Sequence, residues 1–114
     1  MINSKAKKVS ISFRTSEKIE QRMLQRIIGD GYGLKGKSKW ICDAVENFLA
    51  MPSFWDLVDI ASAQEDLRKN SNFTPTEALL KKIEDAIVIV RKHYPLLEGV
   101  QSNIIRASIN QKLI

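Results

Sequence analysis

The stretch FRTSEKIEQRMLQRI, residues 13–27, recurs in outline as FTPTEALLKKIEDAI, residues 73–87, at an offset of 60 positions. In each copy a hydroxyl residue precedes a glutamate, Ser16-Glu17 in the first and Thr76-Glu77 in the second. This pair is typical of a helix start, because the hydroxyl caps a backbone N–H and the acid faces the positive end of the helix dipole. Apolar residues then recur in steps of four, at Ile19, Met23 and Ile27 and at Leu79, Ile83 and Ile87. Each copy therefore predicts an amphipathic helix.

A second pair of segments matches farther along the chain. SKWICDAVENFL, residues 38–49, aligns with SNIIRASINQKL, residues 102–113, at an offset of 64. We expect Ser38 and Ser102 to cap a second helix in each copy. The change from 60 to 64 predicts that the second copy is longer by about one helical turn. The chain thus contains an internal repeat of two helix pairs.

A strand is predicted before the first helix of each copy. Val9, Ile11 and Phe13 alternate with Ser10, Ser12 and Arg14, which is the period of a strand with one buried face. In residues 69–74, Phe73 is expected to point inward, and three polar residues are expected to point outward: Asn70, Asn72 and Thr74. Ser71 stands where the first copy has Ile11, which weakens the register of this second strand. Pro75 should lie just past its end, because proline has no backbone donor.

Breaks in these patterns divide the chain. Glycines at positions 29–36 separate the first two helices, and Pro95 follows the first helix of the second copy. Residues 86–90, AIVIV, suit a strand by residue type, but the helical spacing before them favours a buried helix. Between the copies we expect a short connecting helix with Ser53 as its cap. The predicted boundaries are a basic arm at 1–8, a first unit at 9–50, a connector at 51–68 and a second unit at 69–114, with 9–114 forming one compact domain.

Composition narrows the class of protein. The formal charge is +5 and the pI about 9.5, a balance that favours polyanionic partners. Residues 1–50 carry +5, residues 51–70 carry −2 and residues 71–114 carry +2, so both repeats are basic around an acidic connector. The single cysteine suits a reducing compartment, and we find no stretch of signal-peptide or transmembrane type. We therefore expect a cytoplasmic protein without membrane association.

The order strand, helix, turn, helix, with a Ser-x-x-Ile start to the second helix, resembles the ribbon-helix-helix family of DNA-binding proteins. ISFRTSEKI resembles the family's strand and first helix, and SKWICDAVENFL resembles its second helix. The resemblance spans Ser10 to Leu49 and, more weakly, Asn70 to Leu113. Members such as the Arc and MetJ repressors read DNA with a β-ribbon formed by two chains. Two copies in one chain resemble the TraY-type accessory proteins of conjugative relaxosomes.

This resemblance implies a mainly α fold with a small β-ribbon, in which the tandem units form an intramolecular pseudo-dimer. It also implies sequence-specific binding of double-stranded DNA in the major groove, in transcription regulation or in plasmid transfer or partition. The expected base-reading residues alternate along the two strands: Ser10, Ser12, Arg14, Asn70, Asn72 and Thr74. Arg14 suits a guanine edge, and Asn70 or Asn72 suits an adenine edge. From the pattern alone, Arg14 is equally typical of a solvated surface.

Phosphate contacts are expected at the starts of the second helices, where free N–H groups and the helix dipole attract anions. The expected residues are Lys37, Ser38, Lys39, Gln101 and Ser102, together with Lys8 of the basic arm, which also contains Lys5 and Lys7. Because the two strands carry different polar residues, we expect a non-palindromic DNA site.

Other functions have less support in the sequence. Cys42 and His93 are single residues of their kinds and no carboxylates are paired at a recognisable spacing, so we expect no enzyme activity, metal or cofactor. Trp40 is expected in the core or an interface, as is Trp55. The alternative is a helical protein-interaction module, such as an antitoxin or adaptor, whose basic surface binds an acidic partner protein. The connector with Phe54 and Trp55 would then be a docking element. Further copies of the chain on DNA, or a recruited protein, are additional expected partners.

Overall fold

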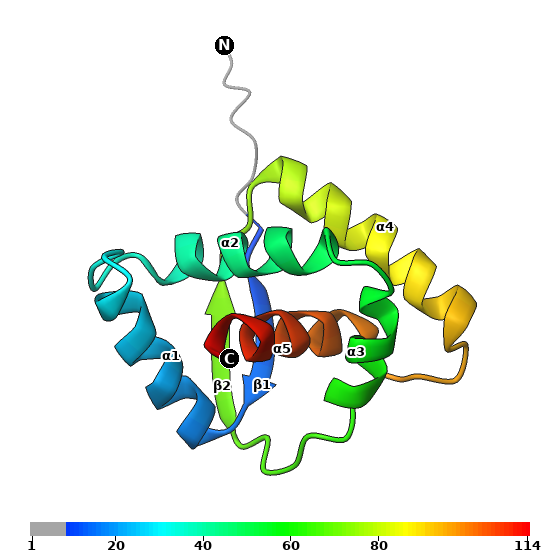
Figure 1. Ribbon diagram of the computed structural model, residues 1–114, viewed down its shortest axis with the longest axis horizontal. Coiled ribbons are helices and arrows are strands. Elements are labelled where there is room, and N and C mark those ends of the chain that lie inside the picture. Colours follow the sequence, from blue (N-terminus) through cyan, green and yellow to red (C-terminus); the bar gives the residue numbers. More distant parts are fainter. Residues whose placement is uncertain (1–8) are drawn as a thin grey trace.

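The computed structural model describes residues 9–114, in which five helices pack with a two-stranded antiparallel sheet (Figure 1). In chain order the elements are β1 (Ile11–Thr15), α1 (Glu17–Gly29), α2 (Lys37–Leu49), α3 (Phe54–Ala61), β2 (Lys69–Phe73), α4 (Glu77–His93) and α5 (Val100–Leu113). The expected mainly helical fold with a small β-ribbon is confirmed. Residues 1–8, and with them the predicted basic arm and Lys8, lie outside the described residues.

The two strands that pair come from the two halves of the chain. Ser12 lies opposite Asn72 and Arg14 opposite Asn70, so the expected antiparallel pairing is confirmed. The ladder is shorter than predicted at one end, because β1 begins at Ile11 and β2 ends at Phe73. Val9, expected to be buried, precedes β1 and is 44% exposed. Pro75 follows the ladder as expected, since it cannot donate a ladder hydrogen bond.

One face of this ribbon is buried. The inward residues are Ile11, Phe13, Thr15, Ser71 and Phe73. Phe13 and Phe73 meet edge to face, with ring centroids 6.4 Å apart. The few apolar residues of β2 are therefore sufficient to form a strand that pairs with β1. Ser71 is buried at the position where the first copy has Ile11.

The first helix of each repeat starts as the sequence predicts. The Ser16 hydroxyl accepts a hydrogen bond from the Ile19 N–H at 3.1 Å, and the Thr76 hydroxyl accepts one from the Leu79 N–H at 3.1 Å. Helix α4 has 17 residues against 13 in α1, which confirms the extra turn. Residues 86–90 lie within α4, so their interpretation as helix is also confirmed.

The predicted caps of the second helices are wrong. Gly36 holds the N-cap position of α2 and Gly99 that of α5, while Ser38 and Ser102 lie inside the first turn. Close packing explains the glycine at residue 36, where a Cβ would lie 2.4 Å from the Tyr32 carbonyl oxygen. At Gly99 the backbone is left-handed, with φ +62°, a conformation that glycine adopts without strain.

Helix α5 lies at the centre of the fold, in front of the ribbon and between α2 and α3 (Figure 1). Because it contacts neighbours on several sides, every residue from Asn103 to Ile109 is buried. A helix buried all round loses the one-sided apolar stripe from which amphipathic helices are recognised. This explains why the repeat alignment, and not a hydrophobic pattern, located α5.

The connector forms α3, as expected. Ser53 occupies the N-cap position as expected, but its backbone angles are left-handed and its side chain makes no capping hydrogen bond. Phe54 is buried and packs edge to face on Phe48, with ring centroids 5.8 Å apart. Trp55 is half-buried and stacks on His93 at 4.2 Å. Helix α3 is thus bound to the core and to α4. None of the helices in residues 9–114 has the length and apolar character needed to cross a bilayer.

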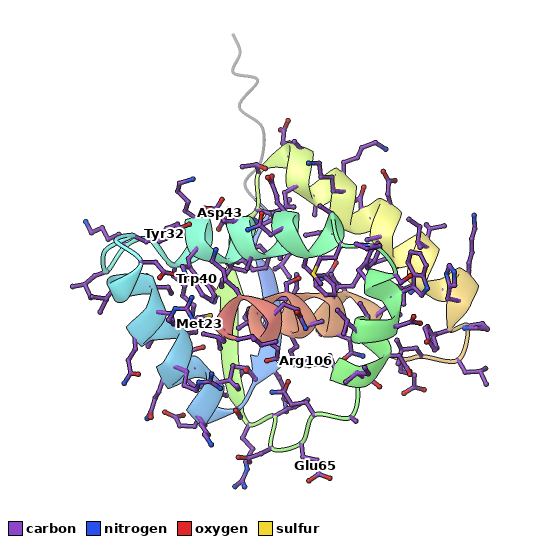
Figure 2. The ribbon with its side chains drawn as sticks, viewed as in Figure 1. Met23, Tyr32, Trp40, Asp43, Glu65 and Arg106 are labelled. Carbon is purple, nitrogen blue, oxygen red and sulfur yellow. The ribbon has the colours of Figure 1, made fainter. Side chains whose placement is uncertain are left out.

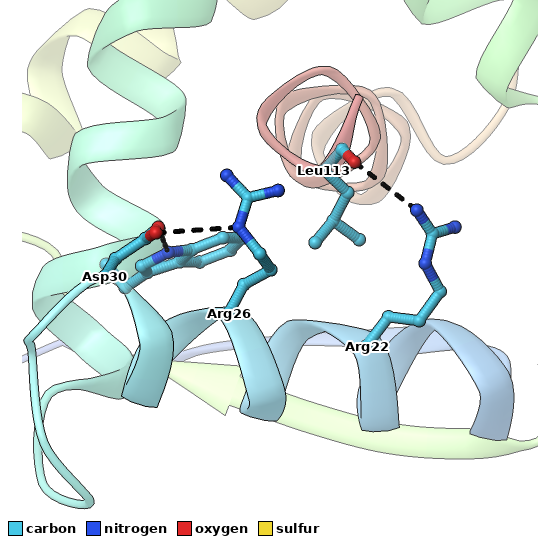
Figure 3. A network of polar contacts seen from close by, with 5 residues as sticks. Arg22, Arg26, Asp30 and Leu113 are labelled. Carbon is cyan, nitrogen blue, oxygen red and sulfur yellow. Dashed lines mark hydrogen bonds and ion pairs between the residues drawn. The ribbon is translucent and has the colours of Figure 1, made fainter.

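Polar contacts tie α1 to the second helices of both repeats (Figure 3). The Trp40 indole N–H donates to the Asp30 carboxylate at 3.0 Å, and Arg26 pairs with the same group at 3.5 Å. Arg22 donates to the Leu113 carbonyl at 3.3 Å. The Trp40 hydrogen bond, aided by Arg26, holds the pKa of Asp30 below its usual value of 3.8.

This network predicts a specific acid response. Because the pKa of Asp30 is lowered by folding, its ionised form stabilises the protein above pH ~4, and this contribution disappears as the pH falls through the lowered value. Asp30→Asn should therefore have a lower Tm than the wild type at pH 7, with the gap closing toward pH ~2. Thermal unfolding from pH 7 to pH 2 measures it. In a Trp40→Phe background, which lacks the indole donor, the pH-dependent gap should shrink; an unchanged gap there would contradict the assignment.

Candidate nucleic-acid interface

The outer side of the ribbon carries four exposed polar side chains, which we call the ribbon face: Ser12, Arg14, Asn70 and Asn72. They lie together because alternate strand residues point to one side and the antiparallel register places them in two cross-strand pairs. Arg14 lies opposite Asn70, and Ser12 lies opposite Asn72. Four of the six residues expected to read bases are thus on one exposed surface.

The other two expected base-reading residues lie beyond the ladder. Ser10 is exposed but precedes β1. Thr74 is half-buried rather than outward, because α2 holds its backbone: the Thr74 N–H donates to the Ser38 hydroxyl at 3.0 Å, and the Cys42 thiol donates to the Thr74 carbonyl at 3.6 Å. Thr74 is therefore less exposed than the sequence predicts.

The start of α5 lies beside the ribbon face. An open concavity is lined by the four ribbon-face residues and also by Gly99, Ser102 and Arg106. Ser102 is half-buried here and Gln101 is exposed. The structure thus places one of the two expected phosphate-binding helix starts next to the predicted base-reading residues.

At the start of α2, unlike that of α5, two of the expected phosphate-binding residues are bonded to other parts of the protein. The Lys37 ammonium pairs with Glu20 at 3.2 Å, and the Glu20 side chain is almost entirely buried. Lys39 lies 3.8 Å from Asp43 and is largely exposed, so screening by water leaves that pair weak. With Ser38 bonded to Thr74, Lys39 is the expected phosphate-binding residue of α2 that remains best placed to reach an external anion.

Arg106 is the residue that sequence reasoning missed. It is 8% exposed, and from α5 it reaches the ribbon, where its Nη1 donates to the Arg14 carbonyl at 3.0 Å (Figure 2). Its Nη2 donates to the Asn103 side-chain oxygen. Burial lowers the pKa of its guanidinium. The repeat alignment pairs it with half-buried Cys42, and only its position within an apolar run signalled burial.

Residues 9–114 contain no group of three His, Cys, Asp or Glu side chains that could hold a metal ion. Burial raises the pKa of the Cys42 thiol, which keeps it in its less reactive protonated form. Comparison with known protein families, curated proteins and solved structures finds no match to this chain.

Proposed function

We propose that this protein binds double-stranded DNA sequence-specifically by inserting the β1–β2 ribbon into the major groove, as a tandem ribbon-helix-helix unit. The observation that carries this proposal is the ribbon face, where Ser12, Arg14, Asn70 and Asn72 lie exposed on an antiparallel ribbon whose other side is buried. A two-stranded ribbon fits the width of the major groove. The net charge of +5 supports the attraction to a polyanion that such binding needs.

The strand register supports a pseudo-dimer within one chain. Ser12 and Asn72, which pair across the ribbon, are also equivalent positions at the repeat offset of 60. A two-fold axis through this pair would exchange the two pairs that flank it, Ile11 with Phe73 and Phe13 with Ser71. The repeat offset gives the same result, because Ile11 is equivalent to Ser71 and Phe13 is equivalent to Phe73. This is the relation that two identical chains have in a symmetric dimer.

The contacts between helices and strands repeat in the same way. Cys42 donates to the Thr74 carbonyl, and Arg106, its equivalent in the second repeat, donates to the Arg14 carbonyl. Arg14 and Thr74 are themselves 60 positions apart. Each second helix is therefore held to the strand of the repeat other than its own, which supports interlocked units rather than two units side by side.

The ribbon face also suggests how bases are read. Arg14 suits bidentate hydrogen bonding to a guanine O6 and N7, and Asn70 or Asn72 suits an adenine N6 and N7. Because Arg14 pairs with Asn70 and Ser12 pairs with Asn72, the two strands present different groups along the groove. The proposal therefore includes an asymmetric DNA site bound by one chain.

Selection of bound sequences from random double-stranded DNA tests this directly. We expect one enriched, non-palindromic motif that contains at least one G·C pair, and one protein chain per selected site by titration. Retention should fall steeply as the salt concentration rises. Enrichment of no motif would refute base reading, and a palindromic motif occupied by two chains would refute the single-chain pseudo-dimer.

The cellular role proposed with this activity is transcription regulation or an accessory role in plasmid transfer or partition, in the cytoplasm. The adaptor alternative gains no support from the connector. Phe54 is 6% exposed and packs on Phe48, and Trp55 is covered on one side by His93. Both side chains therefore contribute to packing within the fold.

A further inference from the structure

An open groove with a volume of about 630 Å³ lies between α1, α3 and α5. It runs between the start of α1 and the end of α3, beside the last turns of α5 (Figure 1). None of the described residues that line it belongs to the ribbon face or to the concavity beside the start of α5. The groove is therefore a surface separate from the proposed DNA interface.

The walls of the groove carry aliphatic side chains from all three helices. Helix α1 contributes Ile19, α3 contributes Leu57 and Ile60, and α5 contributes Leu113. Ile60 is 67% exposed, and Ile114, which also lines the groove, is 90% exposed. Single exposed apolar residues are common on protein surfaces, but a group of them at one hollow indicates a place where a partner binds.

The edge of the groove formed by α1 is basic. Lys18, Arg22 and Arg26 follow one another in steps of four along this helix, and the first two line the groove. Arg22 points toward the end of α5, where it donates to the Leu113 carbonyl, a neutral acceptor (Figure 3). Among the described residues that line the groove, Glu65 is the only carboxylate. This charge balance favours an apolar ligand that carries negative charge.

The matching place in the other half of the molecule indicates which ligand fits. Lys82 is the repeat equivalent of Arg22, and Leu49 is the equivalent of Leu113. Both line a smaller hollow, of about 270 Å³, between α2 and α4. Phe54 lines the same hollow, is buried, and is the first residue of α3, which also contains two aspartates. At this counterpart the chain thus supplies an aromatic residue that begins an acidic helix.

We propose that the groove between α1, α3 and α5 docks an amphipathic helix of a partner protein. This helix places an aromatic or large aliphatic anchor between the groove walls and acidic residues beside Lys18 and Arg22. A helix is favoured over an extended segment, because extended segments bind at open sheet edges and the walls of this groove are helical. The proposal goes beyond the proposed function and does not depend on it. A chain bound to DNA through its ribbon would bring the partner to the same DNA site.

Selection from a displayed library of random peptides about 16 residues long, enough for about four helical turns, tests the groove with the full chain as target. We expect the enriched peptides to share apolar residues at steps of three and four, with at least one aromatic residue and with Asp or Glu beside them. In a titration of the ¹⁵N-labelled chain, an enriched peptide should shift the amides of residues 16–22, 57–65 and 107–114. Enrichment of no peptide, or shifts centred on another surface, would overturn the proposal.

Matched variants separate docking in the groove from general effects. Ile60→Ser should weaken peptide binding by at least about tenfold, as truncation of a central interface contact does. Lys18→Glu should weaken it by about three- to fivefold and reduce its dependence on salt. Leu96→Ser and Lys81→Glu change exposed residues outside the groove and should leave peptide binding unchanged. Equal losses for the groove variants and these controls would contradict the proposal. Because all four side chains are exposed, the variants should fold, which circular dichroism checks.

Two other occupants of the groove predict different results. If a second copy of this chain fills it, the wild type should sediment as a dimer that Ile60→Ser or the peptide dissociates. If its basic edge belongs to the DNA surface, a selected DNA site should displace the peptide, and Lys18→Glu should weaken DNA binding more than Lys81→Glu does. Either result would overturn the proposal. Simultaneous binding of peptide and DNA supports it, whereas peptide binding by a chain that binds no DNA refutes only the proposed function.

Discussion

Arg14→Ala is expected to weaken binding to the selected DNA site by about 5- to 150-fold. This corresponds to the loss of one bidentate contact to guanine, about 1–3 kcal/mol. Arg14 is exposed on the ribbon face, so its removal should not unfold the ribbon. The largest effect should fall on a single G·C pair of the motif, where the variant should tolerate other bases. Binding measured on the motif and on each single-base variant tests both the size and the position of the effect.

Arg91→Ala is a matched control for the removal of one positive charge. Arg91 is exposed in the last turn of α4, outside the ribbon face. If DNA binding depended only on total charge, the two variants would lose similar affinity and neither would change base preference. That result would contradict the reading role of Arg14 and leave only sequence-independent attraction to phosphates.

Trp40→Ala is expected to lower the free energy of unfolding by about 3–5 kcal/mol, the usual cost of truncating a buried aromatic residue. Trp40 is completely buried at the start of α2, where α1 and α5 also meet (Figure 2). Its indole donates to Asp30, and the Lys112 ammonium lies 5.6 Å from the ring centre. Small domains are stable by only about 5–15 kcal/mol, so the variant should be partly unfolded or close to it. Urea unfolding followed by circular dichroism measures the change.

Trp55→Ala serves as the comparison, because Trp55 is half-buried and packs on Phe54 and His93 at the edge of the core. Its loss should cost less than half as much as that of Trp40. Equal losses for the two variants would mean that the region between α1, α2 and α5 is not the centre of the core.

Local sequence was sufficient to predict the structural role of a residue whose partners lie within a few positions of it. Ser16 and Thr76 cap helices through N–H groups three residues away, so their roles follow from the residues alone. Alternation within β1 predicts which of its side chains are buried, because the strand's period is independent of its neighbours. The four residues of the ribbon face were predicted for the same reason, whereas Ser10 and Thr74, also expected there, lie beyond the ladder.

Contacts between residues that are distant in the sequence decided the features that local sequence did not predict. Ser38 has the residue type of a helix cap, but its hydroxyl accepts a hydrogen bond from the Thr74 N–H, 36 positions away. Lys37 has the character of a free cation until folding brings Glu20 to it. Arg106 is buried because α5 runs through the middle of the molecule. The sequence by itself determined the repeat, the strand period and the first caps. The tertiary structure decided which polar groups remain exposed, because that depends on which of them form hydrogen bonds with the other repeat.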